Sequence, residues 1–567
     1  MLVFDLESVG SPIALPEGAI DPSAFGARYI SLRNVNRFLE QVEELDPGLI
    51  VWPGGTVAET RTDRYGFEYD GLYEPSTGKP GLYEMMEIAV AENTGLSLIV
   101  PTARYADDPD ALTADLNGFL GELLAGDFGP LPNELILEIG NEYYAHFDGP
   151  SAASDYAELA EAAVTEIALA LADPTINQIG ADIEIAVQSG RTLEDDTLIR
   201  DGLSDFAQSN VDMIVQHRFA LQPEGIDARA ELAGDILGTW TAEAAGLGAD
   251  APELFVSAWN VASYTRKEAL DDYVAETGVD PATIDLDGRS DAAFETFWQD
   301  ELGRFAYGPE HSAFVLEAFT SYVEEGAASA AIFGTDSIHP GRLSLRDVDG
   351  DNRVFAGGEM YEMLRESVVG MSPIGPSAPY DQDAPATVYG FEDDDKLIAF
   401  VAAGDTPPGD ILIPLDGIKG DFIGVWADSL RAEINPNWRA DFGIPDTPGV
   451  DETPEAWTYA DGIRSAAETH LGDDVLTVAL DAPHEIVRIA FAKTAEGAAE
   501  IETWSDGDGQ NLEAQAILED LPVVPEPPIV EDDNQEDGEG DGLGDDGGGG
   551  GSALAAFGLL PLLLLGF

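Results

Sequence analysis

Residues 135–144 read LILEIGNEYY, and the interpretation of the whole chain starts from this stretch. A short, largely apolar run is followed by Gly140, Asn141 and Glu142. Such a run predicts a buried strand, and the polar residues after it are expected at the strand's far end. If other strands of the chain lie parallel to this one, their far ends all meet at the same face of the sheet.

Seven other apolar runs share this form, at residues 27–32, 48–54, 96–103, 183–190, 211–217, 253–261 and 330–336. Helix-like stretches lie between the runs, at residues 36–45, 83–93, 111–125, 156–172 and 311–326. Eight strand–helix units predict a closed parallel (β/α)8 barrel over residues 1–375. A doubly wound open sheet is the alternative, and it is weaker because no glycine-rich phosphate loop opens the first helix.

The helical pattern stops after the barrel. Residues 385–495 contain short β-type runs separated by Gly, Pro and Asp turns, which predicts an antiparallel β-sandwich. Residues 520–551 form an acidic, Pro- and Gly-rich linker, and residues 552–567 form a hydrophobic tail. The fold class is therefore α/β, with a barrel, a sandwich and a disordered tail.

The charge of the chain is extreme, with 109 Asp and Glu against 26 Lys and Arg, which gives a net charge of −83. Such a surface repels nucleic acids and anionic lipids, so we discount both as partners. Salt screening would relieve the self-repulsion, which favours a saline habitat, with a calcium-rich one as the alternative. The absence of cysteine excludes disulfides and thiolate metal sites.

The C-terminal end suggests attachment to the cell envelope. A glycine run precedes an apolar stretch that, as a helix, spans about 22 Å, less than the roughly 30 Å of a bilayer core. This order resembles bacterial sorting tails of the GlyGly type, although those end in several arginines. We expect a secreted or cell-surface bacterial protein, and a marginal hydrophobic tail is the alternative. The first ten residues show no secretory signal pattern.

Barrel enzymes of this kind carry their active sites at the carboxyl ends of the strands. The polar and aromatic residues expected there are Trp52 after the second strand, Asn141, Glu142 and Tyr143 after the fourth, His217 after the sixth, and Trp259 and Asn260 after the seventh. Together with Pro53-Gly54-Gly55, they resemble the motifs of glycoside hydrolase clan A, most closely families 39, 51 and 79. The resemblance covers about residues 25–490.

The resemblance implies a protein that acts on an extracellular polysaccharide or glycoside. Glu142 would be the general acid/base, and Asn141 would bond the sugar 2-hydroxyl. A partly apolar setting is expected to raise the pKa of Glu142 toward the range that an acid needs. The predicted sugar contacts are Trp52, Tyr143, His217, Trp259 and Asn260, while packing or structural hydrogen bonding remains an alternative for each.

The chain departs from the family pattern around one subsite. Ala258 occupies the position of the nucleophile, Phe219 replaces a tyrosine, and Val51 replaces an arginine. Three explanations stay open: a barrel that only binds glycans, a replacement carboxylate at Asp336 or Glu59, or a register in strand seven that is one residue off. A purely structural surface protein is a further class. No cofactor is predicted.

One acidic loop resembles the first half of a calcium site. Asp347, Asp349 and Asp351 alternate around a turn glycine, but the expected later glutamate is displaced by one residue. We therefore interpret the loop as an acidic turn and keep Ca²⁺ as the weaker alternative.

Overall fold

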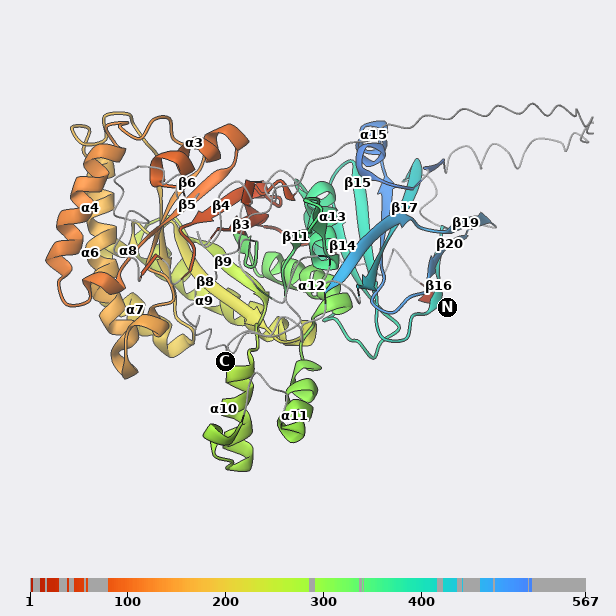
Figure 1. Ribbon diagram of the computed structural model, residues 1–567. Helices are drawn as coiled ribbons and strands as arrows, with labels where there is room; N and C mark the ends of the chain where they lie inside the picture. Colours follow the sequence, from red (N-terminus) through yellow and green to blue (C-terminus); the bar gives the residue numbers. More distant parts are fainter. Residues whose placement is uncertain are drawn as a thin grey trace, which may run out of the picture.

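The computed structural model has a closed β-barrel beside an antiparallel β-sandwich (Figure 1). Within the residues that the structure describes, no helix combines the length and the hydropathy needed to cross a bilayer. These residues are 2–3, 11–15, 18–29, 38–39, 45–55, 58–59, 80–284, 291–335, 339, 341–415, 422–435, 441, 459–472, 475–507 and 509–511.

The barrel closes in the order β10-β3-β4-β5-β6-β7-β8-β9, and all neighbouring strands are parallel. This confirms the predicted barrel over the open sheet. The strands are β3 (Gly26–Arg28), β4 (Leu49–Trp52), β5 (Gly95–Val100), β6 (Leu135–Ile139), β7 (Glu184–Gln188), β8 (Met213–Ala220), β9 (Glu253–Val261) and β10 (Ala327–Ile332).

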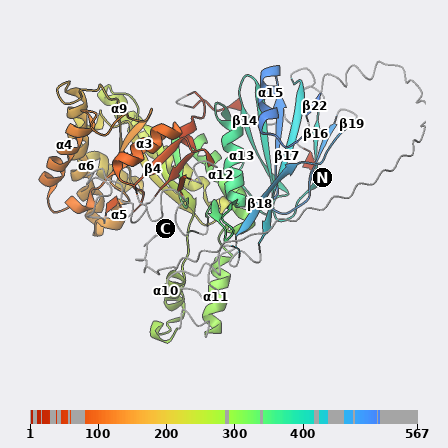
Figure 2. The same cartoon turned by 45° about the horizontal axis from the view of Figure 1, so that its top comes forward.

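Helices surround the barrel, and four of the five predicted helical stretches are present. The fifth, residues 36–45, lies mostly outside the described residues. A pair of helices that we did not predict, α10 and α11, projects from the barrel (Figures 1 and 2). The longer helices of this part are α3 (Leu82–Glu92), α4 (Pro109–Leu123), α6 (Ala152–Ala172), α7 (Leu193–Gly202), α9 (Asp227–Leu247), α10 (Arg266–Thr277), α11 (Ala292–Leu302), α12 (His311–Glu324) and α13 (Ala356–Val368).

The two faces of the barrel wall have different roles. Because side chains alternate along a strand, every second residue faces the barrel interior. The inward residues below the site form one buried apolar layer, made of Leu49, Val51, Ile99, Ile136, Ala186, Met213, Val215, Phe255 and Ala331. The outward residues join the large core shared with the helices. The apolar layer closes the barrel beneath its carboxyl end.

The predicted sandwich is confirmed as two sheets that enclose a separate apolar core, and their strands pair antiparallel except for β1, which runs parallel to β16. One sheet has the order β1-β16-β20-β19, and the other has the order β18-β17-β21-β15-β14-β13-β2, with β22 pairing to β17. The bounds are β1 (Leu2–Val3), β2 (Ser11–Pro12), β13 (Ser372–Gly375), β14 (Ala386–Glu392), β15 (Lys396–Ala403), β16 (Gly409–Pro414), β17 (Gly424–Ile434), β18 (Ala460–Ala466), β19 (Thr469–Gly472), β20 (Val475–Leu480), β21 (Ile486–Ala492) and β22 (Gln510–Asn511).

The ends of the two parts differ from the predicted boundaries. The first residues of the chain pair with sandwich strands, β1 with β16 and β2 with β13, although we assigned residues 1–375 to the barrel. Helix α15 (Ala495–Trp504) and β22 extend the sandwich past residue 495. The predicted linker and tail, residues 520–567, lie outside the described residues.

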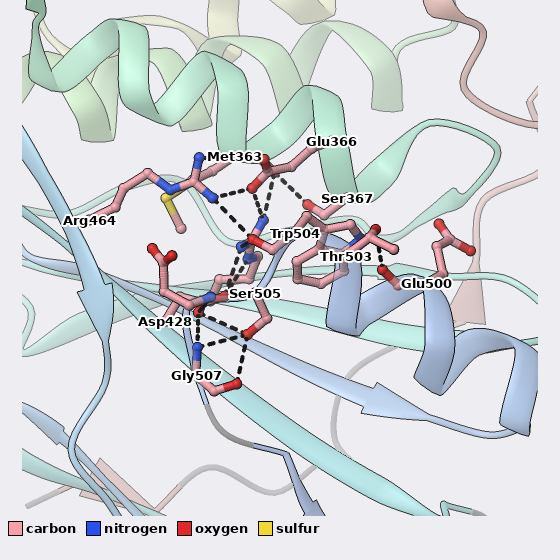
Figure 3. Close-up of polar contacts among 12 residues, drawn as sticks. Met363, Glu366, Ser367, Asp428, Arg464, Glu500, Thr503, Trp504, Ser505 and Gly507 are labelled. Atoms are coloured by element: carbon pink, nitrogen blue, oxygen red, sulfur yellow. Dashed lines mark hydrogen bonds and ion pairs between the residues drawn. The ribbon is translucent and has the colours of Figure 1, made fainter.

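A buried ion-pair network joins the two parts (Figure 3). Arg488 on β21 has no exposed side-chain surface and donates to Asp428 on β17 and to Glu366 on α13. Its guanidinium carbon also lies 4.0 Å above the ring of Trp504 at the end of α15. Arg464 on β18 pairs with the same Glu366 carboxylate. Because α13 precedes the sandwich in the chain, this network fixes the sandwich against the last barrel helix.

Candidate active site

An arginine from the first barrel strand organises the carboxyl end of the barrel. The Nη1 of Arg28 donates to the carbonyl oxygen of Ser257 at 2.5 Å and to its Oγ at 3.1 Å. The Nη2 donates to Oδ1 of Asn141 at 2.6 Å, and Oε1 of Glu138 lies 3.8 Å away. Arg28 is buried, and its contacts therefore tie together β3, β6 and β9 at the level of the predicted site.

Glu142 lies at the rim of this group in a strained backbone conformation. It directly follows β6 and Gly140-Asn141, and its φ is 47°, a left-handed value that is uncommon for a residue with a side chain. Its Oε1 lies 3.2 Å from Nδ1 of His217 and accepts a hydrogen bond from the Tyr144 hydroxyl at 3.2 Å. Backbone strain of this kind concentrates at functional sites, so it supports the predicted location of Glu142.

The carboxyl group of Glu142 is more acidic than we predicted. Burial alone raises its pKa, but the hydrogen bond and charge of His217, the charge of Arg28 and the hydroxyl of Tyr144 together lower the pKa below its ordinary value. The prediction of a raised pKa is therefore wrong, because the apolar neighbours in the sequence are outweighed by two basic side chains from other strands. In this arrangement Glu142 is an anion at neutral pH.

His217 connects Glu142 to a second, deeper glutamate. Its Nε2 lies 3.0 Å from Oγ of Ser257 and 3.7 Å from Oε1 of Glu138. Glu138 also accepts hydrogen bonds from Ser257 Oγ at 3.1 Å and from Gln188 Nε2 at 2.9 Å. The serine, histidine and glutamate occur in the order of a catalytic triad, but the Ser257 hydroxyl donates to Glu138 and accepts from Arg28, so it is engaged within the protein. Ser257, His217 and Glu138 therefore hold one another in position by hydrogen bonds.

Asn141 is fixed by hydrogen bonds through its backbone N and its side-chain oxygen, but not through its side-chain nitrogen. Its backbone N donates to Oε1 of Glu59 at 2.9 Å, and its Oδ1 accepts from Arg28. Its Nδ2 has no hydrogen-bond partner among the described residues, although the side chain is buried. An amide fixed in this way presents two free donor hydrogens, which suits a ligand hydroxyl.

Glu59, one of the two candidate replacement carboxylates, accepts hydrogen bonds from backbone groups. Its carboxylate accepts from the backbone N of Thr102 and of Ala103, both at 2.8 Å, in addition to Asn141. It is 4% exposed. Glu59 therefore fixes the backbone at the ends of β5 and β6 and does not face a substrate. The other candidate, Asp336, lies outside the described residues.

The seventh barrel strand brings no carboxylate to this group. Ser257, one residue before the predicted position, is the β9 side chain that contacts Arg28 and His217, while Ala258 is paired in register with His217. Val51 belongs to the apolar layer below the site. Phe219 lies two residues beyond His217 on β8. Neither Ser257 nor Ala258 carries a carboxylate, and which of them occupies the nucleophile position stays a prediction.

The predicted aromatic sugar contacts are buried in packing. Trp259 is 1% exposed and meets Tyr322 of α12 edge to face, with ring centroids 6.3 Å apart, so it lies on the outer side of the wall. Trp52 is likewise buried in the core shared with the helices. Tyr143 stacks on Tyr156 with ring centroids 5.2 Å apart. These placements favour the packing alternative for Trp52, Tyr143 and Trp259.

Asn260 also makes its hydrogen bonds within the protein. Its Nδ2 donates to the carbonyl oxygens of Phe333 and Gly341, and its Oδ1 faces Nε2 of His311 at 2.9 Å. With no exposed surface, it braces the end of β9 against the segment after β10. This placement favours the structural alternative for Asn260.

The acidic loop after the barrel forms a hydrogen-bonded turn. Oδ1 of Asp347 accepts from the backbone N of Asp349, Gly350 and Asp351. The turn joins β11 (Ser344–Arg346) to β12 (Asn352–Val354). Within the described parts of the chain, no group of three or more His, Asp or Glu residues could hold a metal ion.

The sequence analysis missed Arg28, Glu138 and Ser257. Arg28 and Glu138 stand inside the apolar runs 27–32 and 135–139, where a charged residue must be paired because the strand is buried. That pairing requirement was the signal that could have identified them. Ser257 carries no such signal, since a serine in a buried strand is common.

Comparison with known proteins gives the fold and no closer relationship. No protein-family profile matches the sequence, and no curated protein matches it. A family 51 α-L-arabinofuranosidase from Bifidobacterium longum is 13% identical, with a TM-score of 0.55 over 86% of this chain and 99% of that one. The GH51 arabinofuranosidase from Xanthomonas axonopodis pv. citri is 12% identical, with a TM-score of 0.51 over 86% and 98%. The chain has the barrel-and-sandwich fold of clan A glycoside hydrolases.

Proposed function

We propose that this protein binds a glycoside unit of an extracellular polysaccharide at the carboxyl end of its barrel. The observation that carries the proposal is the pair Asn141-Glu142 just after β6, in which Glu142 has a strained backbone conformation. Asn141 offers an unpartnered amide, and Glu142 offers a carboxylate oxygen. Donors and acceptors fixed side by side suit the hydroxyl groups of a sugar.

Glycoside hydrolysis is the second candidate. It needs one carboxyl group that gives a proton and a second that attacks or activates water. Glu142 has a lowered pKa, and the two other carboxyl groups that hydrogen bonds join to the site among the described residues, Glu138 and Glu59, are engaged by other groups of the protein. These facts favour binding over cleavage. The retained position and strain of Glu142 keep hydrolysis as the alternative.

Binding and hydrolysis of a glycan panel by the full chain separate the two candidates. We expect wild type to bind at least one glycan without turnover, and Asn141→Ala to weaken binding by roughly tenfold through the loss of its hydrogen bonds. Glu166→Gln, on the distant helix α6, is the matched control and should bind like wild type. Turnover by wild type that disappears in Glu142→Gln would establish hydrolysis. No binding to any glycan would reject the proposal.

We also propose that the protein acts at a bacterial cell surface, attached through residues 552–567. The support is the sequence pattern of the acidic linker, the glycine run and the apolar end. Fractionation of cells that express the full chain or a chain ending at residue 551 tests this. The full chain should stay with the envelope, and the shortened chain should appear in the medium. Equal distribution of both would remove the proposal.

A further inference from the structure

A buried arginine on the outer side of the barrel wall has no counter-charge within the described part of the chain. Arg218 on β8 is 6% exposed, and its Nε and Nη2 have no hydrogen-bond partner among the described residues. Burial lowers the pKa of Arg218 to about 10, so the side chain still carries its positive charge at neutral pH. A buried, unpaired charge is costly, and this one occurs in a chain that contains 109 acidic residues.

A residue on the neighbouring strand carries a second unpartnered donor. Arg218 is paired in register with Trp259 on the neighbouring parallel strand β9, so both side chains are on the same side of the wall. The indole Nε1 of Trp259 is buried and also lacks a partner within the described part of the chain. Since Trp259 packs on Tyr322 of α12, the two donors face the layer between the barrel and its helices.

The electrostatic surroundings favour an anion. The groups that affect Arg218 most are the hydroxyls of Tyr322 and Tyr144 and the guanidinium groups of Arg229 and Arg191. Two of these four neighbours are positive, and none is a carboxylate. None of these four neighbours supplies a carboxylate charge that would balance Arg218.

We propose that Arg218 and Trp259 form a buried binding site for one small monovalent anion, such as chloride. One negative charge balances one guanidinium, whereas dehydration of a divalent anion costs far more. A sugar carboxylate is excluded by size, because the two side chains are almost fully buried. The anion would fix the end of β8 that carries His217, and the proposal stands whether or not the site binds glycans.

Thermal unfolding of the full chain in sodium chloride and in sodium gluconate at equal ionic strength tests the proposal. Gluconate is too large for the site, so we expect the melting temperature to be roughly 2–4 °C higher in chloride. Arg218→Met should abolish this difference, and Trp259→Phe should reduce it. Arg304→Met is the control and should preserve the difference, because Arg304 is 60% exposed and paired with Glu301.

Anomalous scattering from crystals grown in bromide gives a direct readout that does not depend on a variant folding. A peak within hydrogen-bond distance of Arg218 and Trp259 is expected. Absence of that peak, or equal melting temperatures of wild type in the two salts, would overturn the proposal. So would an Arg218→Met protein that keeps the full difference.

Discussion

At the scale of single residues, the stability of the site depends on one guanidinium. Arg28 neutralises Glu138, which is fully buried, and donates hydrogen bonds to Ser257 on β9 and to Asn141 just after β6. Arg28→Met removes these bonds and leaves the glutamate without its counter-charge. We expect the free energy of unfolding to fall by about 3–5 kcal/mol, measured by chemical denaturation.

The same variant has an internal check. Arg28 is one of the groups that lower the pKa of Glu142, so its loss should raise that pKa, which NMR titration of the carboxyl group measures. A matched change at the exposed Arg304 should alter stability by less than about 1 kcal/mol. A loss of stability in Arg28→Met no larger than in Arg304→Met would contradict the assigned role.

The apolar runs predict the position of some site residues and not of others, and the difference has a physical reason. Asn141, Glu142 and His217 lie at the ends of apolar runs, and the ends of the strands bring them to the barrel rim. Trp259 and Asn260 also lie near the end of such a run, yet their side chains pack within the protein. The registers of β8 with β9 and of β9 with β10 shift along their length. A register shift changes which face a residue occupies, and no local pattern reveals it.

At the scale of elements, helix α12 sets a pH dependence at the junction of barrel and sandwich (Figure 1). Its Glu317 accepts from the hydroxyl of Tyr389 on β14 at 2.5 Å and from the backbone N of Tyr380 at 3.1 Å. Burial raises the pKa of Glu317 to about 8, with Asp227 adding to the shift and the hydrogen bonds opposing it. The folded state therefore holds this proton more tightly than the unfolded state.

The sign of the effect follows from that difference. The contribution of Glu317 to stability is complete below about pH 4.5 and is lost as the pH rises to about 8. Glu317→Gln keeps an acceptor oxygen without a titrating proton. We expect the variant to lose less stability than wild type between pH 5 and pH 8, by on the order of 2 kcal/mol. Denaturation curves at both pH values measure this, and parallel losses in the two proteins would contradict it.

At the scale of the whole molecule, local repetition determined what could be predicted. Eight apolar runs gave the barrel, because each run and its helix form one unit that repeats along the chain. Strands β1 and β2 join the sandwich although they are far from its other strands along the chain. Each is two residues long, and they pair with partners near residues 411 and 374. Pairing at such a separation leaves no periodic signal in a short segment, so the sequence could not assign them.

The net charge of −83 predicts that folding needs salt. At 0.01 M ionic strength the screening length is about 30 Å, so charges across one domain repel, while at 1 M it is about 3 Å. The unfolded chain spreads these charges apart, so they repel one another less than in the folded state. Screening therefore stabilises the folded state more than the unfolded state. We expect the melting temperature to rise through 1 M sodium gluconate, a salt that avoids the chloride site.

Melting temperatures measured in calcium distinguish charge screening from specific ion binding. Screening predicts that millimolar calcium, at matched ionic strength, changes the melting temperature no more than sodium does. A saturable increase at millimolar calcium that a chelator reverses would instead show that carboxylate clusters bind the ion, as in a calcium-rich habitat. A melting temperature that stays constant from 0.01 to 1 M salt would contradict both the screening and the calcium-binding explanation. The acidic surface would then impose no repulsion on the folded chain.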